Sequence, residues 1–263
     1  MELKDILERI KEGQMDIDAA ADKICSMGYF SVSDIAKADT HRMERTGVPE
    51  ALLGEGKLAK DLVEIAKVHV KRSGRVLITR VSDEQLDYLQ KAFGNNIEWN
   101  ERGRSAVVHD GTPRPSSGGV IGILSAGTSD IGVAEEARVV AQEMGCEVVS
   151  IYDVGVAGIQ RLIPQIDVLK EKGVSALVVA AGREGTLPTI VAGLIDVPVI
   201  GLPVSIGYGA GGSGKAALMS MLQSCSVITV VNIDAGFVAG AFAARLGNMV
   251  AQACKDAGSD IST

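Results

Sequence analysis

A cysteine and a glycine-rich loop share one stretch of the sequence, from Val199 to Cys225. The stretch begins as an apolar run, passes through IGYGAGGSGK and continues as a segment of small and apolar residues. Glycine lets a backbone approach a ligand closely, and the free N–H groups at a helix N-terminus favour negative charge. The loop therefore predicts an anion site. The residues expected to contribute to it are Gly209, Gly211, Gly212 and Lys215.

Residues 209–215 also satisfy the GxxxxGK pattern of a P-loop. The next residue is Ala216, whereas a P-loop NTPase uses a Ser or Thr hydroxyl at that position to bind magnesium. No acidic partner strand of the Walker B kind is evident. We therefore expect a loop that binds phosphate or a nucleotide, and not an ATPase.

The thiol of Cys225 has two interpretations. A buried free cysteine is commonly inert packing, and residue type alone favours that interpretation. Its neighbours on both sides are serines, which suit a more polar setting. The three histidines, His41, His69 and His109, all lie in the N-terminal part, so a protease-like triad is disfavoured. A thiol that adds reversibly to an electron-poor ring would need less help.

Polar residues also follow two earlier apolar runs, the first at 120–124 and the second at 146–152. After the first run, hydroxyls, a glycine and an acid fit either phosphate or ribose binding or an ordinary helix N-cap. Asp153 follows the second run, where a ribose hydroxyl, a metal ion and a helix cap all remain open. The residues concerned are Ser125, Gly127, Thr128, Ser129, Asp130, Asp153 and Gly155.

A charged pair embedded in small residues, Gly182-Arg183-Glu184-Gly185, follows the third apolar run. The pair is either structural, or Glu184 is an acid–base group whose pKa is raised by burial in a glycine-lined pocket. The sequence leaves these two interpretations balanced.

Composition excludes several classes of protein. Hydrophobic residues make up 46% and charged residues 22% of the 263 residues, so a core can form. The net charge of -7 argues against a nucleic-acid partner. The 4 cysteines lack CxxC spacing, which disfavours a disulfide framework or zinc knot. With no signal peptide and no bilayer-length apolar run, we expect a cytoplasmic protein without a membrane partner.

The N-terminal part reads as a small α/β unit. Short helices are expected up to about residue 41, a helix over 58–73, a strand over 75–82, a capped helix, and strand-like residues over 97–110. The charged stretch 39–57 is either a solvated connector or a site for an acidic ligand. Its candidate residues are Asp39, Arg42, Arg45, Glu50 and Lys57. The linker composition of 111–119 places the domain limits at 1–115 and 116–263.

Beyond residue 120, five apolar runs, the last of them over 226–234, alternate with helical segments. This alternation predicts a parallel sheet with right-handed crossovers, and the unbroken apolar runs predict burial of both its faces. The expected fold is α/β, a five-stranded parallel doubly wound sheet with a smaller N-terminal α/β domain. In such sheets ligands bind beyond the carboxyl ends of the strands, where the candidate residues should gather.

Five segments of this half, taken jointly, resemble the LarB family of pyridinium-3,5-biscarboxylic acid mononucleotide synthases. They are SAGTSD, DVGVAG, AGREGTLP, IGYGAGGSGKAALMSMLQSC and VVNIDAGFVAG, and upstream DTHRMERTGVPEALLGEGK resembles the family's N-terminal region. The C-terminal half is more distantly similar to PurE-type aminoimidazole ribonucleotide carboxylases, which have a flavodoxin-like sheet.

The resemblance implies the first step in making a nickel-pincer cofactor. The enzyme would carboxylate the pyridinium ring of nicotinic acid adenine dinucleotide with carbon dioxide or bicarbonate. It would also hydrolyse the phosphoanhydride and release AMP. Magnesium would assist at the diphosphate, with Asp153 as a candidate ligand. Cys225 would add to the ring and Glu184 would receive the ring proton, in a homo-oligomer that is an octamer by the PurE resemblance.

Two positions depart from the family pattern: Gln160 stands where a histidine is expected, and Arg183 where a methionine is expected. An amide does not titrate near neutrality, so Gln160 cannot move protons as a histidine would. Two other functions remain as alternatives. One is a PurE-like carboxylase or mutase acting on aminoimidazole ribonucleotide, and the other is a non-catalytic nucleotide-binding module.

Overall fold

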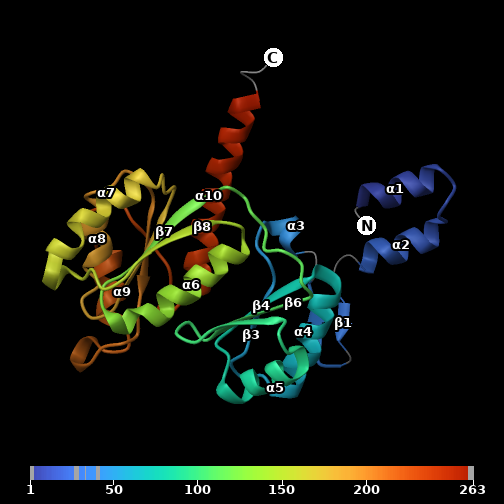
Figure 1. Ribbon diagram of the computed structural model, residues 1–263, viewed down its shortest axis with the longest axis horizontal. Coiled ribbons are helices and arrows are strands. Elements are labelled where there is room, and N and C mark those ends of the chain that lie inside the picture. Colours follow the sequence, from blue (N-terminus) through green and yellow to red (C-terminus); the bar gives the residue numbers. More distant parts are fainter. Residues whose placement is uncertain (1–2, 27–29, 33, 40–41, 260–263) are drawn as a thin grey trace. The chain divides into compact units, whose positions relative to one another are not determined.

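The computed structural model describes residues 3–26, 30–32, 34–39 and 42–259 (Figure 1). These residues form two compact units. The first contains the described residues up to 78, together with 82–98 and 107–112. The second contains 79–81, 99–106 and the described residues from 113 onward. The predicted domain limits at 115 and 116 stay a prediction.

The N-terminal half begins with two amphipathic helices and a short antiparallel hairpin. The helices are α1 (Leu3–Lys11) and α2 (Ile17–Ser26), and the hairpin is β1 (Phe30–Val32) and β2 (Ala36–Ala38). Helix α3 (Arg42–Thr46) and strand β3 (Ala51–Leu53) then occupy the charged stretch 39–57. A purely solvated connector is therefore a wrong expectation there, because β3 joins a sheet.

That sheet has the order β3-β4-β6-β5. Its other strands are β4 (Arg75–Thr79), β5 (Ile97–Asn100) and β6 (Ser105–His109). Along the chain, helix α4 (Ala59–Ser73) lies between β3 and β4, and helix α5 (Asp83–Phe93) lies between β4 and β5. The predicted capped helix is α5: the Ser82 hydroxyl accepts from the backbone N–H of Gln85, whose side chain accepts from the Ser82 backbone. This reciprocal pair satisfies two donors at the helix start.

The second unit holds the five-stranded parallel sheet that the sequence predicts, with the order β11-β10-β9-β7-β8. Its strands are β7 (Val120–Ser125), β8 (Glu147–Ile151), β9 (Leu177–Ala181), β10 (Val199–Pro203) and β11 (Thr229–Val230). The last strand was expected to run over 226–234 and is much shorter. The chain order reverses between β7 and β9, so this is the point at which open α/β sheets bind ligands.

Helices cover both faces of this sheet. On one face, α7 (Ile163–Glu171), α8 (Leu187–Ala192) and α9 (Lys215–Leu222) contribute to an aliphatic core with the strands. The other face carries α6 (Ile131–Glu143) and α10 (Gly236–Ser259), which pack against each other. Gly240 has no room for a Cβ because the backbone of Ala137 lies against it. The small residues of α10 thus serve this close internal packing.

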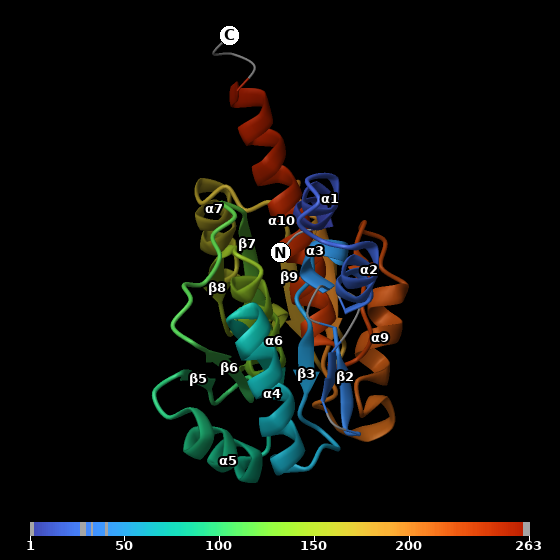
Figure 2. The same cartoon turned by 90° about the vertical axis from the view of Figure 1, so that its right-hand side faces the viewer.

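The far end of α10 continues past the sheet of its own unit (Figure 1, Figure 2). Met249 and Val250 of α10 are exposed. Short 3-10 turns occur in three of the loops that follow strands: Thr128–Asp130, Val156–Arg161 and Gly209–Gly211.

Candidate active site

A cavity of about 640 Å³ lies at the carboxyl edge of the parallel sheet. The loops that follow β7, β8, β9 and β10 line it, so it spans the point where the strand order reverses. Cavities of this size are typical of small-molecule sites. Many residues predicted from the sequence line it. They are Gly127, Ser129, Asp130, Asp153, Gly155, Gly182, Arg183, Glu184 and Gly185.

Asp130 ties two of these loops together. One of its carboxylate oxygens accepts from the backbone N–H of Gly127 at 2.8 Å, and the other accepts from that of Gly182 at 3.1 Å. The side chain makes no cap hydrogen bond to α6, and its bond from Gly127 instead caps the 3-10 turn Thr128–Asp130. Burial raises the pKa of this carboxyl, and the nearby charge of Glu184 adds to the effect. Asp130 therefore shapes the cavity.

Ser125 is fully buried and does not line the cavity. Its hydroxyl accepts from the backbone N–H of Asp153 at 3.2 Å, which joins the end of β7 to the loop after β8. Asp153 has a left-handed φ of 58°. Its carboxylate pairs with Arg161 at 2.5 Å. Direct ligand binding by Ser125 was expected, but its position beneath the loops makes it a support for them.

Three of the predicted glycines are needed because the loops touch. A Cβ at Gly182 would lie 2.6 Å from the Ile206 carbonyl oxygen. At Gly185 it would lie 2.6 Å from that of Ala217, and the backbone there also has a left-handed φ of 63°. Such distances are far inside van der Waals contact, so only glycine lets these loops close against their neighbours. Gly155 fits against Ala126 in the same way.

Arg183 and Glu184 are exposed at the end of β9 and face both this cavity and an adjoining one of about 250 Å³. The Arg183 guanidinium lies over the ring of Tyr208, 5.0 Å from its centroid, and donates a hydrogen bond to the phenol oxygen at 3.1 Å. The expectation that Glu184 is buried in a glycine pocket is wrong, because its side chain reaches solvent. Glu184 and Arg183 form no ion pair, although their charges interact, and the hydrogen-bond partner of Arg183 is Tyr208.

The glycine-rich loop contributes less to the cavity than its sequence suggests. Gly211 lines the smaller cavity, whereas Gly209, Gly212 and Lys215 line neither. Lys215 is exposed at the first position of α9. Thr128 is likewise exposed and lines neither cavity.

Cys225 is exposed, so its interpretation as inert core packing is wrong. It follows the end of α9 by three residues and lines neither cavity of its own chain. Both flanking serines bind Thr189 of α8: the Ser224 and Thr189 hydroxyls are 2.9 Å apart, and the Ser226 hydroxyl donates to the Thr189 carbonyl at 3.0 Å. The thiol is thus presented to solvent on a tethered turn.

Among the cavity-lining side chains that sequence reasoning missed are Arg161 and Tyr208. Tyr208 stands inside the glycine-rich loop, where an aromatic ring among glycines is itself a signal of a ligand surface. Arg161 follows Gln160, which is exposed and lines neither cavity. Arg161 gives no comparable signal, because its partner Asp153 is recognisable only in the fold.

The charged stretch of the first unit forms a separate cluster. Arg45 pairs with the Asp39 carboxylate, and the Asp39 backbone N–H donates to Glu50 at 2.5 Å. Burial raises the pKa of Glu50. His69 is buried with its Nε2 atom 3.5 Å from Glu50, and burial lowers the pKa of this histidine. Lys57 instead donates to the Leu53 carbonyl.

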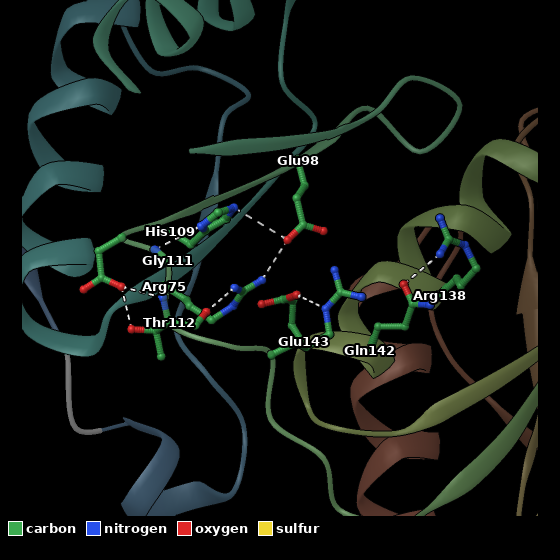
Figure 3. A network of polar contacts seen from close by, with 10 residues as sticks. Arg75, Glu98, His109, Gly111, Thr112, Arg138, Gln142 and Glu143 are labelled. Atoms are coloured by element: carbon green, nitrogen blue, oxygen red, sulfur yellow. Dashed lines mark hydrogen bonds and ion pairs between the residues drawn. The ribbon is translucent and has the colours of Figure 1, made fainter. Parts of the chain in front are cut away.

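His109 belongs to another network of the first unit (Figure 3). Arg75 binds Glu98 at 3.1 Å, His109 approaches the same carboxylate at 3.8 Å, and the Gly111 backbone N–H donates to the other ring nitrogen of His109. His41 lies outside the described residues. Neither His69 nor His109 lines the cavities at the sheet edge.

Two negative observations concern the described part of the chain. None of its helices combines the length and apolar character that a bilayer crossing requires. Among the same residues, no three His, Cys, Asp or Glu side chains converge as metal ligands.

Comparison of the sequence with known protein families identifies both parts of this chain. Residues 30–110 match the family model described as LarB/PurE-like N-terminal domain, and residues 120–260 match the one described as AIR carboxylase. The chain belongs to the LarB/PurE-like family. With the mutase relative described below, these two matches indicate a carboxylase- or mutase-type enzyme.

Relatives support the assignment to the LarB/PurE-like family. An uncharacterised protein of Methanocaldococcus jannaschii is 38% identical over 253 residues, which cover 94% of this chain and 98% of that protein. The N5-carboxyaminoimidazole ribonucleotide mutase of Pyrococcus horikoshii is 29% identical over 118 residues. That match covers 43% of this chain and 63% of the mutase.

Proposed function

We propose that this protein carboxylates the pyridinium ring of nicotinic acid adenine dinucleotide and hydrolyses its phosphoanhydride. The products are pyridinium-3,5-biscarboxylic acid mononucleotide and AMP, and carbon dioxide or bicarbonate supplies the new carboxyl group. The observation that carries the proposal is the joining, in one chain, of a LarB/PurE-like N-terminal domain to an AIR carboxylase domain. The cavity at the sheet edge supports it.

The ring needs an activating nucleophile because a pyridinium is electron-poor and does not attack carbon dioxide. The Cys225 thiolate adds to the ring, forming a C–S bond and leaving an enamine-like carbon that attacks carbon dioxide. Glu184 then receives the proton from that carbon, and the C–S bond breaks to restore the aromatic ring. The net change replaces a ring hydrogen by a carboxylate without oxidation or reduction. Covalent catalysis of this kind splits one difficult step into easier ones.

The cavity supports binding of the mononucleotide half. Ser129 offers an exposed hydroxyl there, while the Asp130 and Asp153 carboxylates are already engaged by backbone N–H groups and by Arg161. These carboxylates therefore hold the loops in place, and the ligand meets the loop backbone, Ser129 and the side chains after β9. Water adds across the phosphoanhydride as the second reaction.

The position of Cys225 has a consequence for the assembly. The thiol is exposed but lines neither of the two cavities described above, whereas Glu184 lines both. We therefore include in the proposal a homo-oligomer, an octamer by the PurE resemblance, in which Cys225 of one copy serves the ligand bound by another. In that arrangement the tethered turn that carries Cys225 presents the thiol across an interface.

Magnesium stays a prediction. Asp153, its candidate ligand, is paired with Arg161, and the described residues contain no converging set of ligands. These residues do not by themselves form a metal site. Magnesium commonly binds through substrate phosphates with one or two carboxylates, so it would enter with the diphosphate.

Mass spectrometry of the products tests the reaction directly. The protein is incubated with nicotinic acid adenine dinucleotide, magnesium and ¹³C-bicarbonate, and the expected products are AMP and a labelled dicarboxylated mononucleotide. Cys225→Ser should abolish the labelled product. Full turnover by this variant would refute covalent catalysis.

Mixing variants tests the shared site. Cys225→Ser and Glu184→Gln, each inactive alone, should regain part of the activity when they are unfolded together and refolded as mixed oligomers. Absence of any regain, with mixed oligomers verified by mass, would place the two residues in the same copy.

The Pyrococcus relative motivates a second candidate, a mutase or carboxylase acting on an aminoimidazole ribonucleotide. It predicts conversion of N5-carboxyaminoimidazole ribonucleotide that Cys225→Ser leaves intact. It also gives no role to the N-terminal domain. If neither substrate is converted but nucleotides still bind, the alternative of a non-catalytic nucleotide-binding module is supported.

A further inference from the structure

Two guanidinium groups line the larger cavity, and they differ in what neutralises them. Arg161 is paired with the Asp153 carboxylate at 2.5 Å. Arg183 forms no ion pair with a carboxylate within the described parts of the chain, and its partner is the uncharged phenol of Tyr208. The negative charge of Glu184 is near enough to act on Arg183, but the two side chains form no ion pair, so the guanidinium donors stay available at the cavity wall.

The Arg183 side chain is held in place from two sides. Its own backbone adopts a left-handed φ of 45°, an uncommon conformation for a residue other than glycine. The neighbouring Gly182 N–H is fixed by Asp130, and Gly185 is packed against Ala217. This stretch of backbone directs the guanidinium toward Tyr208, which comes from the loop after β10.

The contact with Tyr208 leaves most of the guanidinium free to bind. A guanidinium has five N–H donors, and the phenol oxygen uses one of them. Stacking on the ring occupies a face of the group and leaves its donor edges open. A stacked, pre-oriented guanidinium is suited to two parallel hydrogen bonds from an oxyanion.

We propose that Arg183, positioned by Tyr208, binds an oxyanion of the ligand, either a ring carboxylate or a phosphate, and so sets the specificity of the site. The inference rests on the proposed function, for which it names the substrate group that is recognised. Arg183 and its neighbour Glu184 then act on the same ligand. Arg183 holds the anionic group while Glu184 receives a proton.

Calorimetric titration with three probes tests this inference: nicotinic acid adenine dinucleotide, nicotinamide adenine dinucleotide and inorganic pyrophosphate. The two dinucleotides differ only in a ring carboxylate against an uncharged amide. Arg183→Met should weaken binding of the acid dinucleotide by about tenfold or more, as expected for loss of a charge-assisted hydrogen bond. Arg183→Lys should recover part of this affinity.

The probes distinguish the two sources of the oxyanion. If Arg183 binds the ring carboxylate, the wild-type preference for the acid over the amide dinucleotide disappears in Arg183→Met. If it binds a phosphate, this variant weakens both dinucleotides equally and pyrophosphate with them. Tyr208→Phe keeps the ring under the guanidinium and removes the hydrogen bond, so it should give an intermediate loss of the same preference or affinity.

Control variants separate binding from folding. Arg245→Met removes an exposed arginine of α10 that lines neither cavity, and it should leave all three affinities unchanged. Arg183→Gly removes the guanidinium where glycine suits the left-handed backbone. It should bind as poorly as Arg183→Met without a lower melting temperature.

Equal affinities of the wild type and Arg183→Met for every probe would overturn the inference, as would absence of any binding by the wild type. If the wild type binds pyrophosphate through Arg183 but neither dinucleotide, the proposed function fails and the oxyanion site stands. If both dinucleotides bind and are converted with no dependence on Arg183, the proposed function stands and the oxyanion site at Arg183 fails.

Discussion

Glu136 is a buried carboxyl whose ionisation should limit the stability of the protein at neutral and alkaline pH. It lies in α6 and is 6% exposed. Burial raises its pKa to about 7, with the negative charge of Asp234 adding to the shift and the charge of Arg80 and a hydrogen bond from Thr79 opposing it. The uncharged form is therefore the one that the folded structure favours. We predict that Glu136→Gln, which resembles that form, stabilises the protein as pH rises.

The magnitude follows from the displaced pKa. The carboxyl ionises near 4.5 in the unfolded chain and near 7 in the folded protein. This difference corresponds to about 3 kcal/mol. Below pH 4 both states hold the proton and the group has no effect. Between the two pKa values the unfolded state releases its proton first, so stability falls by about 1.4 kcal/mol per pH unit. Above about pH 8 the full cost is present.

Urea unfolding of the wild type and Glu136→Gln across this pH range is the assay. The variant should gain less than about 1 kcal/mol at pH 5 and about 3 kcal/mol at pH 8. The matched control is Glu135→Gln at the adjacent position. Burial acts to raise the pKa of Glu135, but hydrogen bonds from Arg138, Tyr152 and Asn100 together outweigh it and lower the pKa, so its substitution should destabilise the protein at pH 8. A difference between the wild type and Glu136→Gln that does not change with pH would refute the reasoning.

Three further predictions concern backbone, thiols and a helix start. Gly185→Ala should destabilise the protein by about 2 kcal/mol or more in urea unfolding, because it combines a left-handed backbone with a Cβ clash; unchanged stability would show that the two loops separate easily. In the native protein iodoacetamide should modify the exposed Cys225, whereas Cys146, which is buried with a raised pKa, should react only after unfolding; peptide mass spectrometry distinguishes them, and equal rates would contradict the burial. Ser82→Ala removes one half of a capping box and should cost about 1 kcal/mol, measured by thermal unfolding against Ser82→Thr, which keeps the hydroxyl.

The parallel sheet was predictable because its signals are local. The strands are mainly apolar runs, most of them followed by a glycine-containing loop and all by a helical segment, so their parallel direction and the ligand-binding edge of the sheet follow from the chain alone. The last strand was overestimated, since 226–234 is apolar enough for a strand but only Thr229 and Val230 pair with β10. The short β3 was missed because three residues in a charged stretch give no periodic pattern.

Side-chain roles were harder to predict because they depend on partners far along the chain. Asp130 looks like a helix cap in sequence, yet one of its partners is Gly182, which lies in the loop after a different strand. Glu184 sits among glycines, which suggests burial, but the loop turns its side chain outward. The sequence could therefore predict the type of site, the edge of the sheet where it lies and the group of residues around it. It could not predict the role of each side chain.

The structure divides the polar residues of the cavity into those that bind one another and those that do not. Ser125 holds the backbone of Asp153, and Asp153 neutralises the charge of Arg161, so these groups fix the loops. Arg183 and Glu184 face the cavity from a loop that is tied to Asp130 through Gly182 and packed on Ala217 at Gly185, and such support positions reactive groups accurately. The chemistry of this site is therefore expected from the loop after β9, and substitutions among the supporting residues should lower stability and activity together.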